Sequence, residues 1–233
     1  MNKRTIVIVF LIIFSSIEIF SQSGGLNLTL AFPQGEFKDN MKRTGIGGNA
    51  EAIFWLPSRV PFGVGLNLAY LNYGNETRSE PFSLTIPDVT VEVSRNYNIA
   101  QGHLLFRLTT NSYSVRPYLD LLFGGAYLFT ETKIRSYGGN QNEVASSTNF
   151  DDWAWSYGVG GGLMYLVFDS NQNENGLGEI YLDFKARYIY GTEAEYLQQG
   201  SVTIANGRAY YKTSRSKTDL LTASLGVIVY FMP

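Results

Sequence analysis

The sequence predicts an all-β protein: a closed antiparallel up-and-down barrel of about eight strands that spans a membrane after an N-terminal signal peptide. Apolar and polar residues alternate with a period of two along nearly all of the chain after residue 22. Aromatic residues make up 15% of the chain and charged residues only 16%, whereas a soluble domain usually carries about 25% charged residues. After residue 22 no apolar run approaches the roughly 20 residues of a spanning helix. A membrane protein without such a run must itself be a closed barrel, because lipid offers no hydrogen-bond partners to the polar groups at open sheet edges.

The N-terminus predicts export. Lys3 and Arg4 precede an uncharged run over residues 6–17, and the small polar stretch of residues 21–25 follows. This pattern is typical of a cleaved secretory signal peptide. We expect a signal peptide over residues 1–22, with Ser21 as a competing cleavage site, and one barrel domain over residues 23–233. An uncleaved membrane anchor is the alternative. The chain has no Cys, which excludes a lipoprotein anchor and disulfides, and its net charge of -2 argues against a nucleic-acid partner.

Eight segments with period-two alternation are the expected strands. They lie at Leu26–Phe32, Gly45–Leu56, Phe62–Tyr70, Ala100–Leu108, Arg116–Tyr127, Trp153–Tyr165, Glu179–Tyr188 and Thr218–Phe231. Alternation alone does not say which face points inward, because a soluble ligand-binding barrel would alternate as well.

The connections favour an outer-membrane barrel. Those after the second and fourth segments are short, whereas long ones are expected at Gly74–Arg95, Thr130–Asp151 and Gly191–Ser216, with a shorter loop at Gly35–Thr44 on the same rim. Long loops on one rim, with short turns and both termini on the other, are typical of outer-membrane barrels. Within the long connections, Val89–Val93 and Ser201–Ile204 alternate, which predicts hairpins that extend the sheet.

Aromatic residues gather near both predicted rims. Near the long loops the sequence places Tyr70, Tyr73, Tyr97, Tyr127, Phe129, Trp153, Trp155, Tyr188 and Tyr190; near the short rim it places Phe54, Trp55, Phe62, Phe168, Tyr230 and Phe231. Two such belts suit rings that sit at the two membrane interfaces. Ordinary core aromatics of a soluble barrel are the alternative.

The last strand resembles the C-terminal insertion signal that the bacterial barrel-assembly machinery reads. Its marked positions are Ser224, Gly226, Val229 and Phe231. Together with the signal peptide, the opening strand over residues 25–28 and the stretch over residues 33–37, it makes the chain similar to the small eight-stranded outer-membrane barrels of the OmpA and OmpX type. The resemblance implies an outer-membrane location, contact with outer-membrane lipid or lipopolysaccharide, and barrel-assembly machinery as a partner during insertion.

The inward face is expected to carry a network of charges. An eight-stranded barrel has a lumen just wide enough to be filled by its own side chains, and buried charges persist there only if they are paired. The sequence therefore predicts a plug of ion pairs from Glu51, His103, Arg107, Arg116, Asp120, Glu179, Asp183, Lys185 and Arg187. A narrow polar or gated passage is the open alternative.

No catalytic, cofactor-binding or metal-binding residues are predicted. His103 is the only histidine, and its alternation turns it into the lumen. Because binding residues concentrate on loops held by a rigid scaffold, we expect a non-enzymatic structural or surface-interaction protein that acts through its long extracellular loops. Alternatives are an OmpW-like or porin-like conduit for small molecules, an accessory barrel of an envelope secretion or assembly complex, and a soluble periplasmic barrel.

Overall fold

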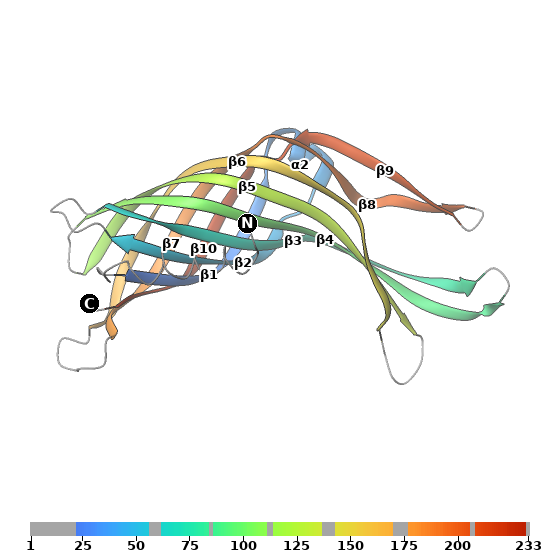
Figure 1. The fold of residues 1–233 in the computed structure, drawn as a ribbon, viewed down its shortest axis with the longest axis horizontal. Coiled ribbons are helices and arrows are strands. Elements are labelled where there is room, and N and C mark those ends of the chain that lie inside the picture. Colours follow the sequence, from blue (N-terminus) through green and yellow to red (C-terminus); the bar gives the residue numbers. More distant parts are fainter. Residues whose placement is uncertain are drawn as a thin grey trace, which may run out of the picture.

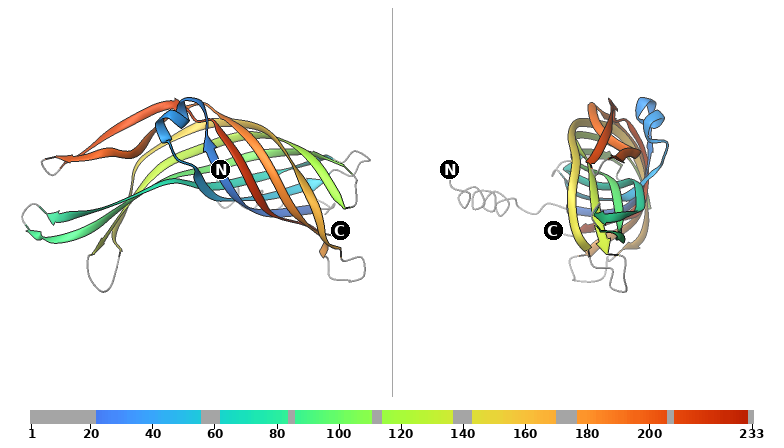
Figure 2. Two further views of the ribbon diagram at one scale, coloured as in Figure 1. Left: turned by 180° about the vertical axis from the view of Figure 1, so that it is seen from behind. Right: turned by 90° about the vertical axis from the view of Figure 1, so that its right-hand side faces the viewer.

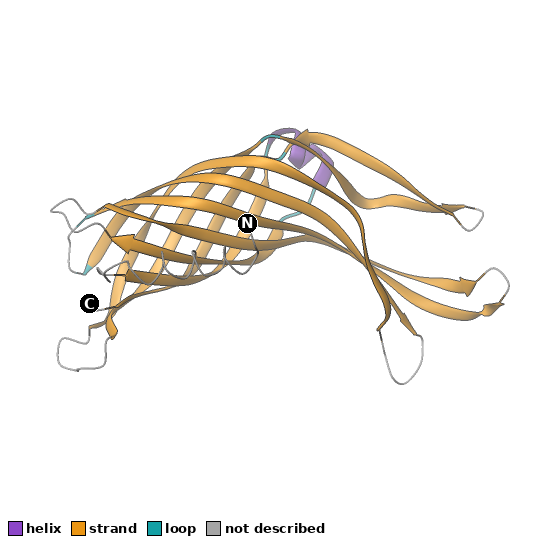
Figure 3. Cartoon of the chain, viewed as in Figure 1, coloured by secondary structure: helices purple, strands orange, loops and turns teal. Residues whose placement is uncertain are grey.

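The computed structural model describes residues 22–55, 62–83, 86–110, 114–136, 143–169, 177–205 and 208–231, almost all of them in strands (Figure 3). The predicted signal peptide lies outside the described residues up to residue 21, and Gln22 already belongs to the first strand. The elements are β1 (Gln22–Pro33), α2 (Gly35–Met41), β2 (Gly45–Trp55), β3 (Phe62–Ser83), β4 (Ile86–Thr109), β5 (Val115–Ser136), β6 (Glu143–Asp169), β7 (Leu177–Gly191), β8 (Glu193–Ala205), β9 (Arg208–Lys217) and β10 (Leu220–Phe231).

Eight of these strands close into a barrel in the order β1-β10-β7-β6-β5-β4-β3-β2, and β2 pairs with β1 to complete the ring (Figure 1). Every neighbouring pair is antiparallel. The seam between the first and last strands runs from Gln22 opposite Phe231 to Pro33 opposite Leu220. The predicted fold class is confirmed: closure pairs the strand edges of the ring, so it offers no free edge to a further strand.

The barrel wall is apolar outside and polar inside. On β1, Leu26 and Leu28 are 72% and 77% exposed, while Asn27 and Thr29 between them are 6% and 4% exposed. The same alternation repeats on β10, where outward Leu225 is 47% exposed. This is the opposite of a soluble ligand-binding barrel, whose apolar face points inward.

Two hairpins continue well beyond the barrel. β3 and β4 stay paired from Gly74 opposite Tyr97 to Ser83 opposite Ile86, and β5 and β6 extend in the same direction (Figure 1). The expected long loops at Gly74–Arg95 and Thr130–Asp151 are therefore mostly strand, and the expected extension at Val89–Val93 is part of β4. Polar cross-strand pairs hold the β3–β4 extension, including Asn75 to Asn96 at 2.7 Å.

The third extension is a separate two-stranded sheet of β8 and β9, which includes the predicted alternating stretch Ser201–Ile204. Beside it, the segment expected as a loop at Gly35–Thr44 contains the helix α2 (Figure 2). Phe37 and Met41, one turn apart, are buried at 0% and 8% exposure. The Phe37 ring meets that of Tyr196 on β8 edge-to-face at 5.0 Å. This apolar contact, invisible to strand periodicity, explains why the segment is helical.

The aromatic belts are only partly as expected. Trp153 and Trp155 are more than half exposed on the outer face, but four other members point inward and are corrected here: Trp55, Tyr73, Tyr97 and Tyr230. Trp55 stacks on Tyr230 at 5.8 Å and donates a hydrogen bond to Ser23 at 3.1 Å. Their position near a rim had suggested membership of a belt. They occupy inward positions in the alternation of their strands, however, so their rings lie on the inner face. Among the described residues no helix is long and apolar enough to cross a membrane.

Candidate functional site

The middle of the lumen holds a cluster of three carboxylates and three cations, hereafter the lumen cluster. Each of its members occupies an inward position of its strand, and all are at most 5% exposed. They are Glu51 on β2, Arg107 on β4, Asp120 on β5, and Asp183, Lys185 and Arg187 on β7.

Arg107 lies at the centre of the lumen cluster and is 0% exposed. It donates two hydrogen bonds to Asp120, from Nε to Oδ1 at 2.7 Å and from Nη2 to Oδ2 at 2.9 Å. Its Nη1 lies 2.9 Å from Glu51 Oε1, and its guanidinium stacks 3.9 Å above the Tyr118 ring. The planar guanidinium fork fits this two-pronged carboxylate contact, which a lysine would not reproduce.

Arg187 joins the same two carboxylates from the other side. It contacts Asp120 Oδ2 through Nε at 3.0 Å and Nη2 at 2.5 Å, and Glu51 Oε2 through Nη2 at 2.9 Å. Its Nη1 donates to Asn67 Oδ1 at 2.9 Å. Residues from three other strands of the ring, β2, β3 and β5, thus meet on the Arg187 guanidinium.

Lys185 completes the charge balance. Its Nζ lies 2.7 Å from Glu51 Oε2 and 2.9 Å from Asp183 Oδ2, and the Tyr118 hydroxyl donates to Asp183 Oδ1 at 2.5 Å. Three negative and three positive groups therefore share contacts across the lumen. Buried charges are costly to desolvate, and such matched geometry offsets that cost.

Two more of the predicted residues form a separate pair closer to the short rim. Arg116 lies 2.9 Å from Glu179, and the two side chains are 17% and 22% exposed. The Arg116 guanidinium also lies over the rings of Tyr181 and Tyr230, at 4.7 and 5.3 Å. This pair lies at the entrance of the lumen, on the short-rim side of the lumen cluster.

His103, the last predicted residue, is buried and contacts a serine that the sequence had not suggested. Its Nε2 lies 2.8 Å from Ser156 Oγ. Its Nδ1 has no hydrogen-bond partner among the described residues. A nucleophile activated by a histidine normally has a third group that orients the ring through the other nitrogen, and that group is missing from the described part of the lumen.

Other polar lumen residues were missed by sequence reasoning: Asn67 and Tyr118, which contact the lumen cluster, and a ladder of hydrogen bonds near the β1–β10 seam. In the ladder Asn49 donates to Thr29 at 3.1 Å, and Thr29 contacts Ser224 at 2.9 Å. Their inward parity was available as a signal, but uncharged residues had not been considered as partners.

The end of the lumen from which the long hairpins project is covered by α2 and the β8–β9 hairpin, hereafter the cap (Figure 2). Glu76 on β3 binds the hairpin: its Oε2 accepts hydrogen bonds from the Gly200 N–H and the Tyr97 hydroxyl, both at 3.1 Å, and it pairs with Arg78. Burial raises the pKa of Glu76, but these hydrogen bonds and the Arg78 charge outweigh it and hold the pKa below its ordinary value. Opposite Glu76, Arg95 is 4% exposed, and its Nε and Nη1 have no partner within the described structure.

The insertion-signal positions all lie on β10. Ser224 faces the lumen, and Phe231, 42% exposed, lies on the outer face at the end of the strand. Val229 shares the outward parity of Phe231. Gly226 packs so tightly on β1 that an added Cβ would lie 2.1 Å from the Leu26 carbonyl oxygen. Only glycine permits this close approach of the seam strands.

Comparison with known proteins finds similarity in architecture only. Neither a protein-family model nor a curated protein matches the sequence. Among solved structures, Ail, the attachment invasion locus protein of Yersinia pestis, in complex with the heparin analogue sucrose octasulfate, is 16% identical, with 91% of this chain and 97% of that chain covered and a TM-score of 0.36. Neisserial surface protein A is 12% identical, with coverage of 91% and 98% and a TM-score of 0.40. A major outer membrane protein from Thermus thermophilus is 12% identical, with coverage of 91% and 100% and a TM-score of 0.41.

Proposed function

We propose that this chain is an integral outer-membrane barrel, exported by a cleaved signal peptide, whose lumen is sealed and whose extracellular hairpins serve a structural or surface-interaction role. The observation that carries the proposal is the inverted polarity of the wall, with leucines outside and an ion-paired cluster inside. Such a surface suits hydrocarbon, because every strand of the ring is paired and the outward side chains are apolar.

Three layers of side chains support a sealed lumen. The Trp55, Tyr181 and Tyr230 rings lie at the short rim, the lumen cluster fills the middle, and Phe37 and Leu197 of the cap belong to an apolar core at the other end. A conduit for small apolar molecules needs an apolar lumen, so the charged middle layer argues against that alternative.

A non-catalytic role is part of the proposal. His103 and Ser156 are 3% and 1% exposed, so neither side chain presents its reactive atoms at the surface of the described structure. The lack of a partner for His103 Nδ1 among the described residues also argues against activation of Ser156 as a nucleophile. The pair is better explained as a buried hydrogen bond between β4 and β6 that passes over Gly124 of the intervening strand β5.

The hairpins that project beyond the barrel support a surface role. On β9, Tyr210 and Tyr211 are 53% and 45% exposed, and exposed tyrosines are common in binding surfaces. An accessory role in an envelope complex would use the same surface. Crosslinking in native membranes, with the wild type compared with Tyr210→Ser/Tyr211→Ser, distinguishes a partner held here from a free-standing barrel.

Fractionation and conductance test the membrane and lumen parts of the proposal. We expect recovery in the outer-membrane fraction and extraction only by detergent; recovery as a soluble periplasmic protein would contradict the membrane assignment. In planar bilayers the purified barrel should show no steady conductance. A stable open level from the wild type would show that the lumen conducts.

A further inference from the structure

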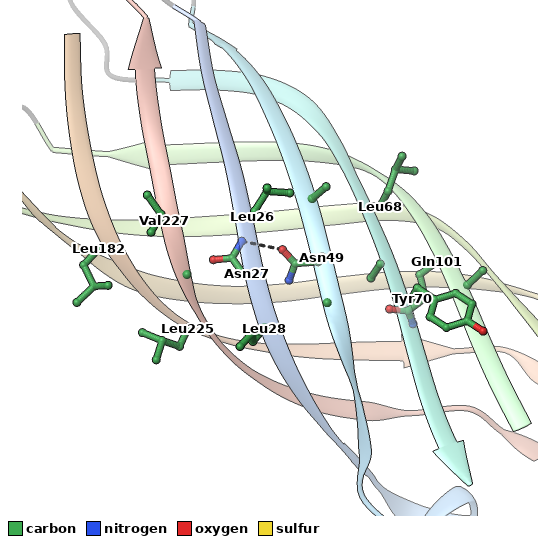
Figure 4. A pocket seen from close by; sticks show the side chains of 15 residues that line it. Leu26, Asn27, Leu28, Asn49, Leu68, Tyr70, Gln101, Leu182, Leu225 and Val227 are labelled. Carbon is green, nitrogen blue, oxygen red and sulfur yellow. Dashed lines mark hydrogen bonds between the residues drawn. The ribbon is translucent and has the colours of Figure 1, made fainter. Parts of the chain in front are cut away.

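The outer face of β1 and its neighbours carries a trough that runs along β2. Leu26 and Leu28 on one side and Leu68 and Tyr70 on the other are large and outward-facing. Between them, β2 contributes only Ala50, opposite Leu26 and Leu68, and Gly48, opposite Leu28 and Tyr70. The result is an apolar groove of about 820 Å³ in the wall (Figure 4).

A second groove, of about 970 Å³, lies at the extracellular end of the same face. Its apolar floor includes Phe32 on β1 and Leu221 on β10, which are register partners. Its rim carries the exposed cations Lys38, Lys42 and Arg43.

The rim of this second groove has an excess of positive charge. Asp39 is the one carboxylate on its lining, so three cations and one anion leave a net charge of +2. None of the three cations forms an ion pair with another described residue. The groove therefore favours an anion.

The packing of α2 fixes this charge on the outside. Phe37 and Met41 are buried in the cap, so Lys38 and Lys42, one residue further along, lie on the exposed side of the helix. Lys42 ends the helix in a left-handed conformation, with φ of 50°, and its N–H donates to the Lys38 carbonyl. The cations therefore lie beyond the end of the lipid-facing wall. The helix that carries them is fixed by the burial of Phe37 and Met41 on its opposite face.

The two grooves follow each other along β1 and β10. From Leu26 to Phe32 the strand rises about 3.3 Å per residue, or roughly 20 Å. At a tilt of about 40° this is roughly 15 Å along the membrane normal, half of a hydrocarbon core about 30 Å thick. The apolar groove thus lies one leaflet below the cations.

We propose that the two grooves together bind one anionic phosphate-bearing lipid of the outer leaflet, with the phosphate at Lys38, Lys42 and Arg43 and an acyl chain in the trough over Gly48 and Ala50. This inference rests on the proposed membrane function. Exposed cations alone hold a free phosphate weakly, whereas an acyl chain in the trough adds apolar contact that free phosphate lacks. The alignment of the two grooves along β1 and β10 is what favours a lipid over a soluble anion, because one molecule with a charged headgroup and a long acyl chain can reach both.

Native mass spectrometry of the delipidated full barrel in non-ionic detergent tests this, with phosphatidylglycerol as the probe and phosphatidylcholine and inorganic phosphate as comparisons. The headgroup variant is Lys38→Gln/Lys42→Gln/Arg43→Gln, and its control, Lys212→Gln/Arg215→Gln/Lys217→Gln, removes three exposed cations from β9. The trough variant is Ala50→Leu, and its control is Ala186→Leu, on the outer face of β7.

We expect one phosphatidylglycerol per barrel, with affinity reduced on the order of tenfold by the headgroup variant and severalfold by Ala50→Leu, and unchanged in both controls. Equal binding of phosphatidylcholine, displacement by inorganic phosphate at equal concentration, or a lipid-free dimer that Ala50→Leu disrupts would each overturn the proposal. Insertion of the wild type and all variants into vesicles is measured in parallel. Failure of the wild type to insert contradicts the proposed function, whereas insertion without selective lipid binding contradicts only this inference.

Discussion

The lumen cluster and the cap close the same barrel by opposite means. The lumen cluster matches three acids with three bases inside a ring of paired strands, and its carboxylates each contact at least one cation at 2.9 Å or less. The cap relies on apolar and aromatic packing around Phe37, Tyr73 and Tyr196. The charged residues of β3 and β4 beside the cap are unevenly paired: Glu76 has three donors, whereas Arg95 opposite it lacks an acceptor for two of its nitrogens within the described structure.

This difference predicts which mutations destabilise each region. In the lumen cluster every charge depends on the others, so the removal of one leaves a buried charge uncompensated. In the cap, apolar packing provides most of the stability. Charged groups such as Glu76 contribute a smaller part, by binding the β8–β9 hairpin to the barrel. Mutations and changes of pH should therefore affect the stability of the lumen cluster and of the cap differently.

The largest effect is expected from Asp120→Ala. Asp120 accepts hydrogen bonds from both Arg107 and Arg187, so its loss leaves the two guanidinium groups to share one carboxylate, that of Glu51. Breaking a buried ion pair typically costs about 3–5 kcal/mol, and we expect a decrease of that size in the free energy of unfolding, measured by urea titration in lipid vesicles. Arg187→Met is the informative second change, because adding it to Asp120→Ala should restore part of the loss. A cost below about 1 kcal/mol for Asp120→Ala would show that the cluster is not coupled.

Phe37→Ala should produce the next largest effect, confined to the cap. Truncation of a fully buried phenylalanine costs about 3–5 kcal/mol, but here the loss falls on the docking of α2 under the hairpin. Hydrogen exchange should accelerate in α2 and β8 and remain slow at the β1–β10 seam. Phe37→Leu, which keeps most of the volume, serves as the matched control. Faster exchange throughout the barrel would mean that the cap and the ring unfold together.

The lumen cluster was predictable in part because strand parity is a local property. Alternation alone turns Glu51, Arg107 and Asp120 inward once the apolar face is assigned to lipid. The pairings were not predictable, since Arg187 reaches Asn67 across 120 residues of sequence and that contact exists only after the ring closes. The cap was not predicted for another reason. Its helix α2 has 7 residues, too few for helical periodicity to show, and the contacts that place it, such as that of Phe37 with Tyr196, come from a distant part of the chain.

Acidification should loosen the cap before it affects the lumen. The depressed pKa of Glu76 means that the folded cap binds its charged form more tightly than the open cap does. That stabilisation is complete above the ordinary carboxyl pKa, about 4.3, and is lost as the pH falls through the lower folded value. The Gly200 amide donates to Glu76. As the pH falls, hydrogen exchange at this amide should slow less than the pH dependence of its intrinsic exchange rate predicts, because the protecting hydrogen bond is lost. In Glu76→Gln this added pH dependence should disappear; its persistence would assign the effect to another group.

Arg95→Met should have the smallest effect and the opposite sign. Arg95 is buried at 4% exposure among apolar neighbours of β4 such as Val93 and Tyr97, and its Nε and Nη1 lack partners among the described residues. Replacing a poorly compensated buried charge by an apolar chain of similar length is often neutral or stabilising by about 1–2 kcal/mol. The same replacement at Arg187 should instead be strongly destabilising, because it removes four hydrogen bonds. Urea titrations of both single variants compare the regions directly, and a large loss for Arg95→Met would show that the cap holds an ion pair as essential as those of the lumen cluster.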